Sequence, residues 1–172
     1  ATAIEGDVWY NASTGLLKMY AALGAWASGG NLNETRDSLA GAGIQTAAVF
    51  FGGNSEPAAF TTASEEYDGS SWTEGNNLNT GRYQPGGTGV QTAALACGGS
   101  TGSVTGVTET YDGSSWTEVG DLNTVRRACS GHGSTTAALC AGGSPGPYYD
   151  VSEEYNGTSW TEGNDLNEAR QG

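Results

Sequence analysis

Two serines lie in the G-x-S-x-G pattern that surrounds the nucleophile of many hydrolases: Ser100 within residues 98–102 and Ser144 within residues 142–146. A nucleophile elbow requires a strand, a sharp turn and a helix, and a serine triad also requires a histidine as general base. Both copies instead lie where a strand is expected to lead into a loop, and His132 is the sole histidine. We therefore interpret both serines as loop residues and predict that the chain is not an enzyme.

His132 lies on or near an expected innermost strand, at a position where the repeat described below has Ala42 and Thr88. Because it departs from the repeat, it could line a central channel, but a histidine without partner groups is a poor metal site or general base. Three Gly-x-Gly sequences, which begin at residues 41, 87 and 131, lack the third glycine, helix and lysine of a phosphate-binding loop. We interpret these glycines as structural.

Acidic residues that could bind Ca²⁺ are present without the spacing of a calcium site. Asp68, Asp112 and the pairs at 65–66 and 153–154 offer oxygen ligands, but no D-x-D-x-D-G sequence occurs. We expect these groups to face water or to pair with the repeated arginines.

The three cysteines are too few, and odd in number, for a disulfide framework, and no Cys-x-x-Cys sequence occurs. Cys129 and Cys140 can face each other across a hairpin, either as a disulfide or as two small buried thiols that pack like alanine. Cys97 has no obvious partner. We predict no metal ion and no cofactor.

The composition excludes two classes of partner. The 172 residues, about one domain, include 19 acidic and 6 basic residues, for a formal net charge of −13. A surface this acidic repels nucleic-acid phosphates and anionic lipid headgroups. The longest apolar stretch, residues 47–51, is too short to span a bilayer. We therefore expect neither nucleic-acid binding nor membrane insertion.

A repeat of about 44 residues organises the chain, and 29 glycines accompany it. Tryptophan, tyrosine and arginine recur in register, at intervals of 44 residues with one interval of 46 for the arginines. These residues are Trp72, Trp116, Trp160, Tyr67, Tyr111, Tyr155, Arg36, Arg82, Arg126 and Arg170. Repeats of this length are typical of β-propeller blades and solenoids. We expect the aromatic residues to fill the space between blades, and the arginines to tie each crossover through carboxylates and carbonyls.

Each unit reads as four short strands with no helix signal. In the second unit we expect strands at 86–90, 92–97, 107–111 and 116–119, with the sequence Asp-Gly-Ser-Ser forming the last turn. Four antiparallel strands per unit indicate a propeller blade. The predicted blades are about 32–77, 78–121 and 122–165, and the start of a further unit follows.

Residues 1–31 read as a partial blade. Strands are expected at 7–11, 16–20 and 25–28, and Tyr20 and Trp26 imitate the repeated Tyr/Trp pair. The fold prediction is thus an all-β propeller section of about four blades. It closes as a small ring, belongs to a larger ring of a longer chain, or is completed by copies of itself.

The paired glycines, followed by tyrosine, tryptophan and arginine, resemble a kelch repeat over about residues 32–172. The link between Tyr111 and Trp116 is shorter than in the kelch pattern, so we expect a tighter outer hairpin. The phrases YDGSSWTE and GVQTAAL also resemble tandem repeats of predicted virion proteins of marine bacteriophages. The opening GDVWYNASTGLLKMY resembles a short β-motif of phage tail fibres. Residues 1–31 are therefore interpreted either as a partial blade or as a β-motif of this type.

The loops after the Gly-Gly pairs differ between units, at 54–62, 100–106 and 144–150. Rigid scaffolds often carry function in such loops, and exposed tyrosines suit stacking on sugars or anchoring a protein. The candidate binding residues are Asn54, Phe60, Ser100, Thr101, Ser144, Tyr148, Tyr149 and Asp150.

The resemblances imply a structural or adhesive virion protein, located in the virion or outside cells, that contacts other virion subunits, copies of itself, or a host-surface glycan or protein. The alternative is a secreted lectin-like module. A lectin should repeat its binding residues every 44 residues. Here the glycine, tyrosine, tryptophan and arginine positions recur, whereas the loops that could bind a ligand vary.

Overall fold

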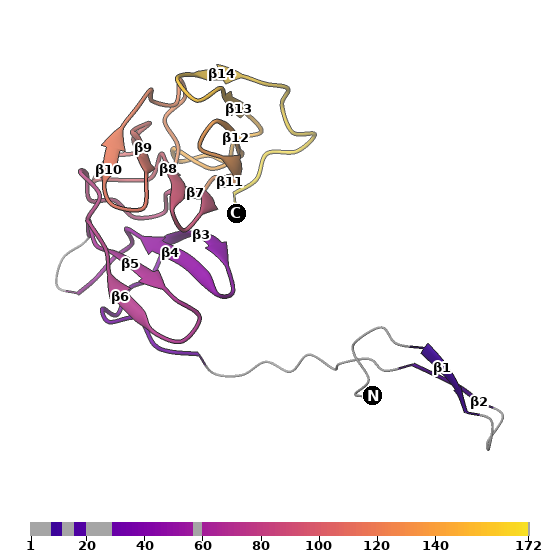
Figure 1. Cartoon of the computed structure of the whole chain (residues 1–172). Coiled ribbons are helices and arrows are strands. Elements are labelled where there is room, and N and C mark those ends of the chain that lie inside the picture. The colour runs from indigo at the N-terminus through magenta and orange to yellow at the C-terminus, as the bar shows by residue number, and fades with distance from the viewer. Residues whose placement is uncertain (1–7, 12–15, 20–28, 57–59, 172) are drawn as a thin grey trace.

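The computed structural model describes residues 8–11, 16–19, 29–56 and 60–171 (Figure 1). Twelve strands of this part form three four-stranded antiparallel sheets, and no helix occurs among the described residues. The predicted all-β fold, built from four-stranded units of blade-like size about 44 residues long, is confirmed. Within the described part of the chain, no helix is long and apolar enough to cross a membrane.

Strand order equals chain order in all three sheets, as expected for blades formed by consecutive hairpins. The strands are β3 (Ala40–Ile44), β4 (Ala47–Phe51), β5 (Ser64–Tyr67) and β6 (Trp72–Glu74) in the first sheet; β7 (Gly86–Val90), β8 (Ala93–Cys97), β9 (Thr108–Tyr111) and β10 (Trp116–Glu118) in the second; and β11 (Ser130–Ser134), β12 (Ala137–Ala141), β13 (Ser152–Tyr155) and β14 (Trp160–Glu162) in the third. We call these sheets the first, second and third blades. The predicted strand ends of the second blade agree with the structure to within one residue.

The first strands of the blades lie side by side, with β7 between β3 and β11 (Figure 1). A Cβ atom on Gly87 would lie 2.9 Å from the carbonyl oxygen of Gly41, and one on Gly131 would lie 2.8 Å from that of Gly87. These contacts are too short for any side chain, so the inner strands approach backbone to backbone. The repeated Gly-x-Gly sequences therefore have a structural role in blade packing.

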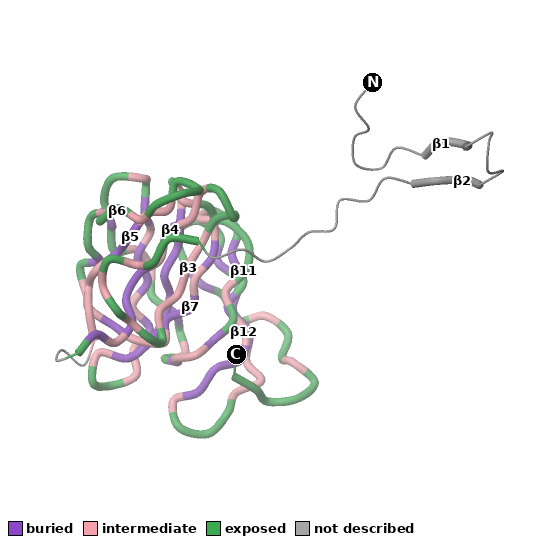
Figure 2. Tube along the Cα trace, turned by 90° about the horizontal axis from the view of Figure 1, so that it is seen from below, coloured by how far each residue is buried: buried purple, intermediate pink, exposed green. Residues whose placement is uncertain are grey.

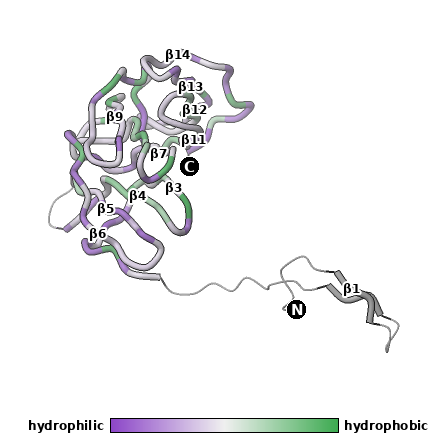
Figure 3. Tube along the Cα trace, viewed as in Figure 1, coloured by the Kyte–Doolittle hydropathy of each residue, from purple (hydrophilic) through white to green (hydrophobic). Residues whose placement is uncertain are grey.

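Two apolar seams hold the blades together. Val49 and Phe51 of the first blade pack against Ala94, Ala96 and the aromatic residues of the second. Leu95 and Cys97 of the second blade pack in the same way against the third. Figure 2 shows buried residues concentrated on the strands that face these seams, and Figure 3 shows hydrophobic residues along β3 and β4 with hydrophilic residues in many outer connections.

A tyrosine and a tryptophan pack together in every blade. The ring centroids are 4.9 Å apart in the Tyr67–Trp72 and Tyr111–Trp116 pairs, and 5.0 Å apart in the third blade. Trp116 also meets Phe51 of the preceding blade edge to face, at 4.8 Å. The second and third pairs are buried in the seams, whereas Tyr67 and Trp72 are half-buried because no described blade precedes them.

The outer turn of each blade is closed by its first polar residue. The Asp68 carboxylate accepts hydrogen bonds from the backbone N–H groups of Ser71 and Ser70, each at 2.8 Å. These bonds from Ser71 and Ser70 lower the pKa of Asp68 from 3.8 to about 2. Asp112 forms the same turn in the second blade, and Asn156 replaces it in the third.

Near the N-terminus, β1 (Val8–Asn11) pairs with β2 (Leu16–Met19) as an antiparallel hairpin. The third strand expected at 25–28, and the residues Tyr20 and Trp26, lie outside the described residues.

Truncation of a seam tryptophan should cost more than truncation of its half-exposed counterpart. We expect Trp116→Ala to lower the free energy of unfolding by about 3–5 kcal/mol, because it leaves a cavity beside Phe51. Trp72→Ala should cost markedly less, since no described blade covers that ring. Urea unfolding measures both, and an equal loss for the two variants would contradict the blade assignment.

Candidate functional site

A network of buried ion pairs and hydrogen bonds ties each blade to the crossover, which is the segment that joins it to the preceding blade. In the third blade, the Arg126 guanidinium donates from Nη2 to Glu153 Oε1 at 2.6 Å and from Nη1 to the carbonyl of Val151 at 2.7 Å. The Glu153 carboxylate also accepts bonds from Asn123 N, Asn123 Nδ2 and Thr124 N, between 2.7 and 3.1 Å. We call this arrangement the latch. It is fully buried, and its hydrogen bonds offset the cost of removing both charges from water.

The other blades repeat the latch. Arg82 pairs with Glu109, and Arg36 pairs with Glu65 at 2.8 Å; all four side chains are at most 3% exposed. Burial lowers the pKa of Arg82, and the Glu109 charge opposes that shift. The repeated arginines at 36, 82 and 126 therefore bind carboxylates and carbonyls across the crossover.

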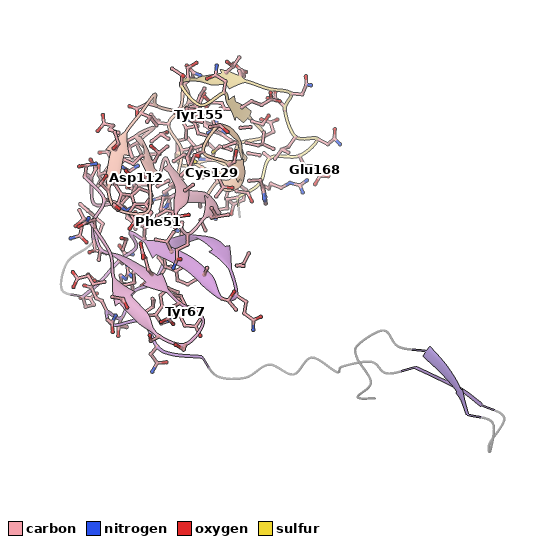
Figure 4. The ribbon with its side chains drawn as sticks, in the orientation of Figure 1. Phe51, Tyr67, Asp112, Cys129, Tyr155 and Glu168 are labelled. Atoms are coloured by element: carbon pink, nitrogen blue, oxygen red, sulfur yellow. The ribbon has the colours of Figure 1, made fainter. Side chains whose placement is uncertain are left out.

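Arg170 has no such partner among the described residues. It occupies the same position of the repeat, but its side chain is 62% exposed and lies 3.9 Å from the exposed carboxylate of Glu168. Figure 4 labels Glu168 at the outer end of the third blade. The crossover at residues 166–170 thus carries an arginine without the buried glutamate that each of its counterparts has.

The adjoining face of the third blade is also uncovered. Leu139 is 36% exposed, whereas its counterparts Val49 and Leu95 are fully buried by the next blade. A shallow hollow of about 360 Å³ lies there, lined in part by His132, Leu139 and Glu154. This face has the residue pattern of a seam, but nothing in the described structure packs on it.

The opposite end of the section differs. An open hollow of about 550 Å³ on the first blade is lined by Phe50, Tyr67 and Trp72, together with β3. The Phe50 ring lies over Gly41, where an added Cβ would come within 2.3 Å of it. Phe50 therefore fills the space over Gly41, whereas a neighbouring inner strand lies over Gly87 and Gly131.

The candidate binding residues fall into two groups. Asn54, Ser100 and Ser144 begin their loops, and their backbones pair with Asp37, Tyr83 and Arg127 of the preceding crossover. Ser100 and Ser144 are buried. Phe60, Thr101, Tyr149 and Asp150 are partly exposed, and Tyr148 is 59% exposed.

The structure places the other chemical candidates apart. Ser100 and Ser144 follow strands that lead into loops, without the helix of a nucleophile elbow. His132 lies exposed on β11, with Nε2 3.1 Å from Ser130 Oγ. Of the acidic pairs, Glu65 and Glu153 belong to latches, and Glu66 accepts a hydrogen bond from the Tyr111 hydroxyl.

Cys97, for which the sequence offers no obvious partner, lies beside the other two cysteines. All three cysteines are free and buried, and the Sγ atoms of Cys97, Cys129 and Cys140 lie within 4.8 Å of one another. Hydrogen bonding from Cys140 and Cys97, together with the charge of Arg126, lowers the pKa of Cys129. The residues come from two blades and are not close in sequence, so spacing along the chain gave no sign of the cluster.

Loss of a latch arginine should be much more costly than loss of Arg170. We expect Arg82→Met to reduce the free energy of unfolding by about 3–5 kcal/mol, because Glu109 is left as a buried, uncompensated charge. Arg170→Met removes only a solvent-exposed pair, worth about 0–1 kcal/mol. Chemical denaturation of both variants tests this difference; a small loss for Arg82→Met would contradict a structural role for the latch.

No protein-family model and no curated protein matches the chain.

Proposed function

We propose that this chain is a structural and adhesive β-propeller section of a bacteriophage appendage, a kelch-like scaffold that joins virion subunits and presents its variable loops to a host surface. The single observation that supports this most strongly is the uncovered face of the third blade together with the exposed side chain of Arg170. Inside the section, equivalent faces and arginines are fully buried. An apolar face next to an exposed arginine of this kind suits the packing of one more blade.

The partner that fits this face is a further blade of the same repeat. Its third strand should supply a glutamate for Arg170, as Glu153 does for Arg126. Its aromatic pair should pack on Leu139, as Tyr155 and Trp160 pack on Leu95. The first blade of a second copy is a poor fit, because its glutamate already binds Arg36 and Phe50 covers its inner strand.

The charge of the chain is compatible with such an assembly. A net charge of −13 makes copies of the chain repel one another at low salt. In salty water the Debye length falls to about 8 Å or less, so subunits can approach and local pairs such as Arg170 with a carboxylate decide the contact.

Arginine accessibility tests this contact in the native particle. We expect a dicarbonyl reagent to modify Arg170 in the isolated chain but not in material purified intact from its source, where a neighbouring blade covers it. Arg82 and Arg126 are internal controls, since both are buried in either state. Equal modification of Arg170 in the chain and in the particle would contradict the proposal.

A lectin-like module is the second candidate, and the aromatic hollow of the first blade favours it. Phe50, Tyr67 and Trp72 line this hollow, and aromatic side chains suit stacking on sugars. The corresponding aromatic residues of the other two blades are buried, so the hollow occurs once in the described section rather than once per blade. That single occurrence is why we rank the scaffold first.

If the loops attach to a host, substitutions in them should weaken adhesion without lowering the stability of the fold. Tyr148→Ala should leave the melting temperature unchanged, because this side chain is 59% exposed, and should weaken adhesion of the particle to host cells. Trp72→Ala is the matched variant for the lectin reading. Loss of adhesion or glycan binding with Trp72→Ala, but not with Tyr148→Ala, would favour the lectin instead.

A further inference from the structure

The three cysteines meet at the seam between the second and third blades. Cys97 ends β8, Cys140 lies in β12, and Cys129 directly precedes β11. Their Sγ atoms all lie within 4.8 Å of one another, and each residue is at most 7% exposed. Figure 4 shows Cys129 near β11, beside the strands of the second blade.

The seam does not need sulfur in order to pack. The first seam has Phe51, Pro85 and Ala96 at the positions equivalent to the cysteines, and Phe51 fills the space against Trp116. The second seam has the same architecture but three thiols that converge from three separate segments. Any mixture of apolar residues of suitable volume would serve packing equally well.

A glycine next to the cluster makes room for the sulfur atoms. A Cβ atom on Gly86 would lie 2.8 Å from Cys129 Sγ and 3.0 Å from Cys97 Sγ. The equivalent residues of the other blades are Ala40 and Ser130, so the repeat itself does not demand glycine at this position. The missing side chain is specific to the blade that borders the cluster.

We propose that Cys97, Cys129 and Cys140 form a buried three-thiolate site for monovalent copper. A trigonal arrangement with metal–sulfur bonds of about 2.3 Å places the sulfur atoms about 4.0 Å apart. The observed cluster needs a contraction of less than 1 Å from its longest separation to reach that geometry.

The donor set favours copper over zinc. Soft thiolate ligands select Cu(I), Zn²⁺ and iron–sulfur clusters, and structural zinc is almost always four-coordinate. Among the described residues, the group contains three cysteines and no histidine or carboxylate as a fourth ligand. Cu(I) is satisfied by three soft ligands in a dry site.

Binding is an exchange of protons for a metal ion, without oxidation or reduction. Three thiols release three protons and bind one Cu⁺, which leaves a site charge of −2. The Arg126 charge acts on Cys129 and Cys140 from within the latch, where it is also paired with Glu153. The bound ion would join β8, β12 and the start of β11, so it would fix the third blade to the second.

Anaerobic titration of the reduced full-length chain tests the site. With Cu(I) supplied as a complex of a coloured chelator, we expect one equivalent to transfer to the protein. X-ray absorption should then show three sulfur scatterers and no nitrogen or oxygen neighbour. Failure of the wild-type chain to compete for Cu(I), or a spectrum with two sulfur neighbours, would overturn the proposal without any variant.

Variants test whether Cu(I) binding depends on the arrangement of the three thiols or only on their presence. Cys97→Ala, Cys129→Ala and Cys140→Ala should each weaken Cu(I) binding by more than about tenfold, the scale at which even outer-shell changes act. Gly86→Ala keeps all three thiols but crowds them, and it should also weaken binding. Gly146→Ala is the control, because a Cβ there meets nothing within 4 Å.

Two further measurements complete the test. Circular dichroism checks that each variant is folded, and Cu(I) should raise the melting temperature of the wild type but not of Cys140→Ala. A parallel titration with Zn²⁺ should show weaker binding. Tighter binding of Zn²⁺ with a water molecule as fourth ligand would overturn the assignment to copper.

Discussion

Each blade depends on a carboxylate that has been removed from water at its third strand. A buried charge of this kind is tolerated only when nearly all of its hydrogen-bonding capacity is used, and Glu153 receives bonds from Asn123, Thr124 and Arg126 together. All of these donors lie in one short crossover. These bonds hold the crossover against the third strand of the blade that follows it.

The two faces of a blade are chemically different, and this gives the section a direction. One face carries the tyrosine–tryptophan pair with small residues, and the other carries two residues of the second strand, Val49 and Phe51 in the first blade and Leu95 and Cys97 in the second. The ends of the section are consequently unlike each other. At one end Phe50 covers the inner strand, and at the other Leu139 and Arg170 stay exposed. The scaffold proposal depends on the second of these ends, where the face that resembles a seam is uncovered.

Much of the blade could be predicted from the sequence, because its strands are local. The limits of β7 and β10 could be predicted from glycines, turn residues and the alternation of polar and apolar residues. Each of these signals spans only a few residues. The arginine–carboxylate pairing was also accessible, since both partners recur with the repeat. The cysteine cluster was not, because Cys97 lies 43 positions before Cys140 and meets it only once two blades pack. The position of Phe50 over Gly41 was not predictable for a related reason. Its counterpart Ala96 is buried in a seam, and only the structure shows which face of a blade lies at an end of the section.

The latch also orders events in time. Arg126 is synthesised 27 residues before Glu153, and Arg36 precedes Glu65 by 29 residues. A nascent chain therefore displays each arginine before the carboxylate that will bury it has left the ribosome. Because each arginine precedes its glutamate along the chain, every latch binds a blade to the segment that leads into it.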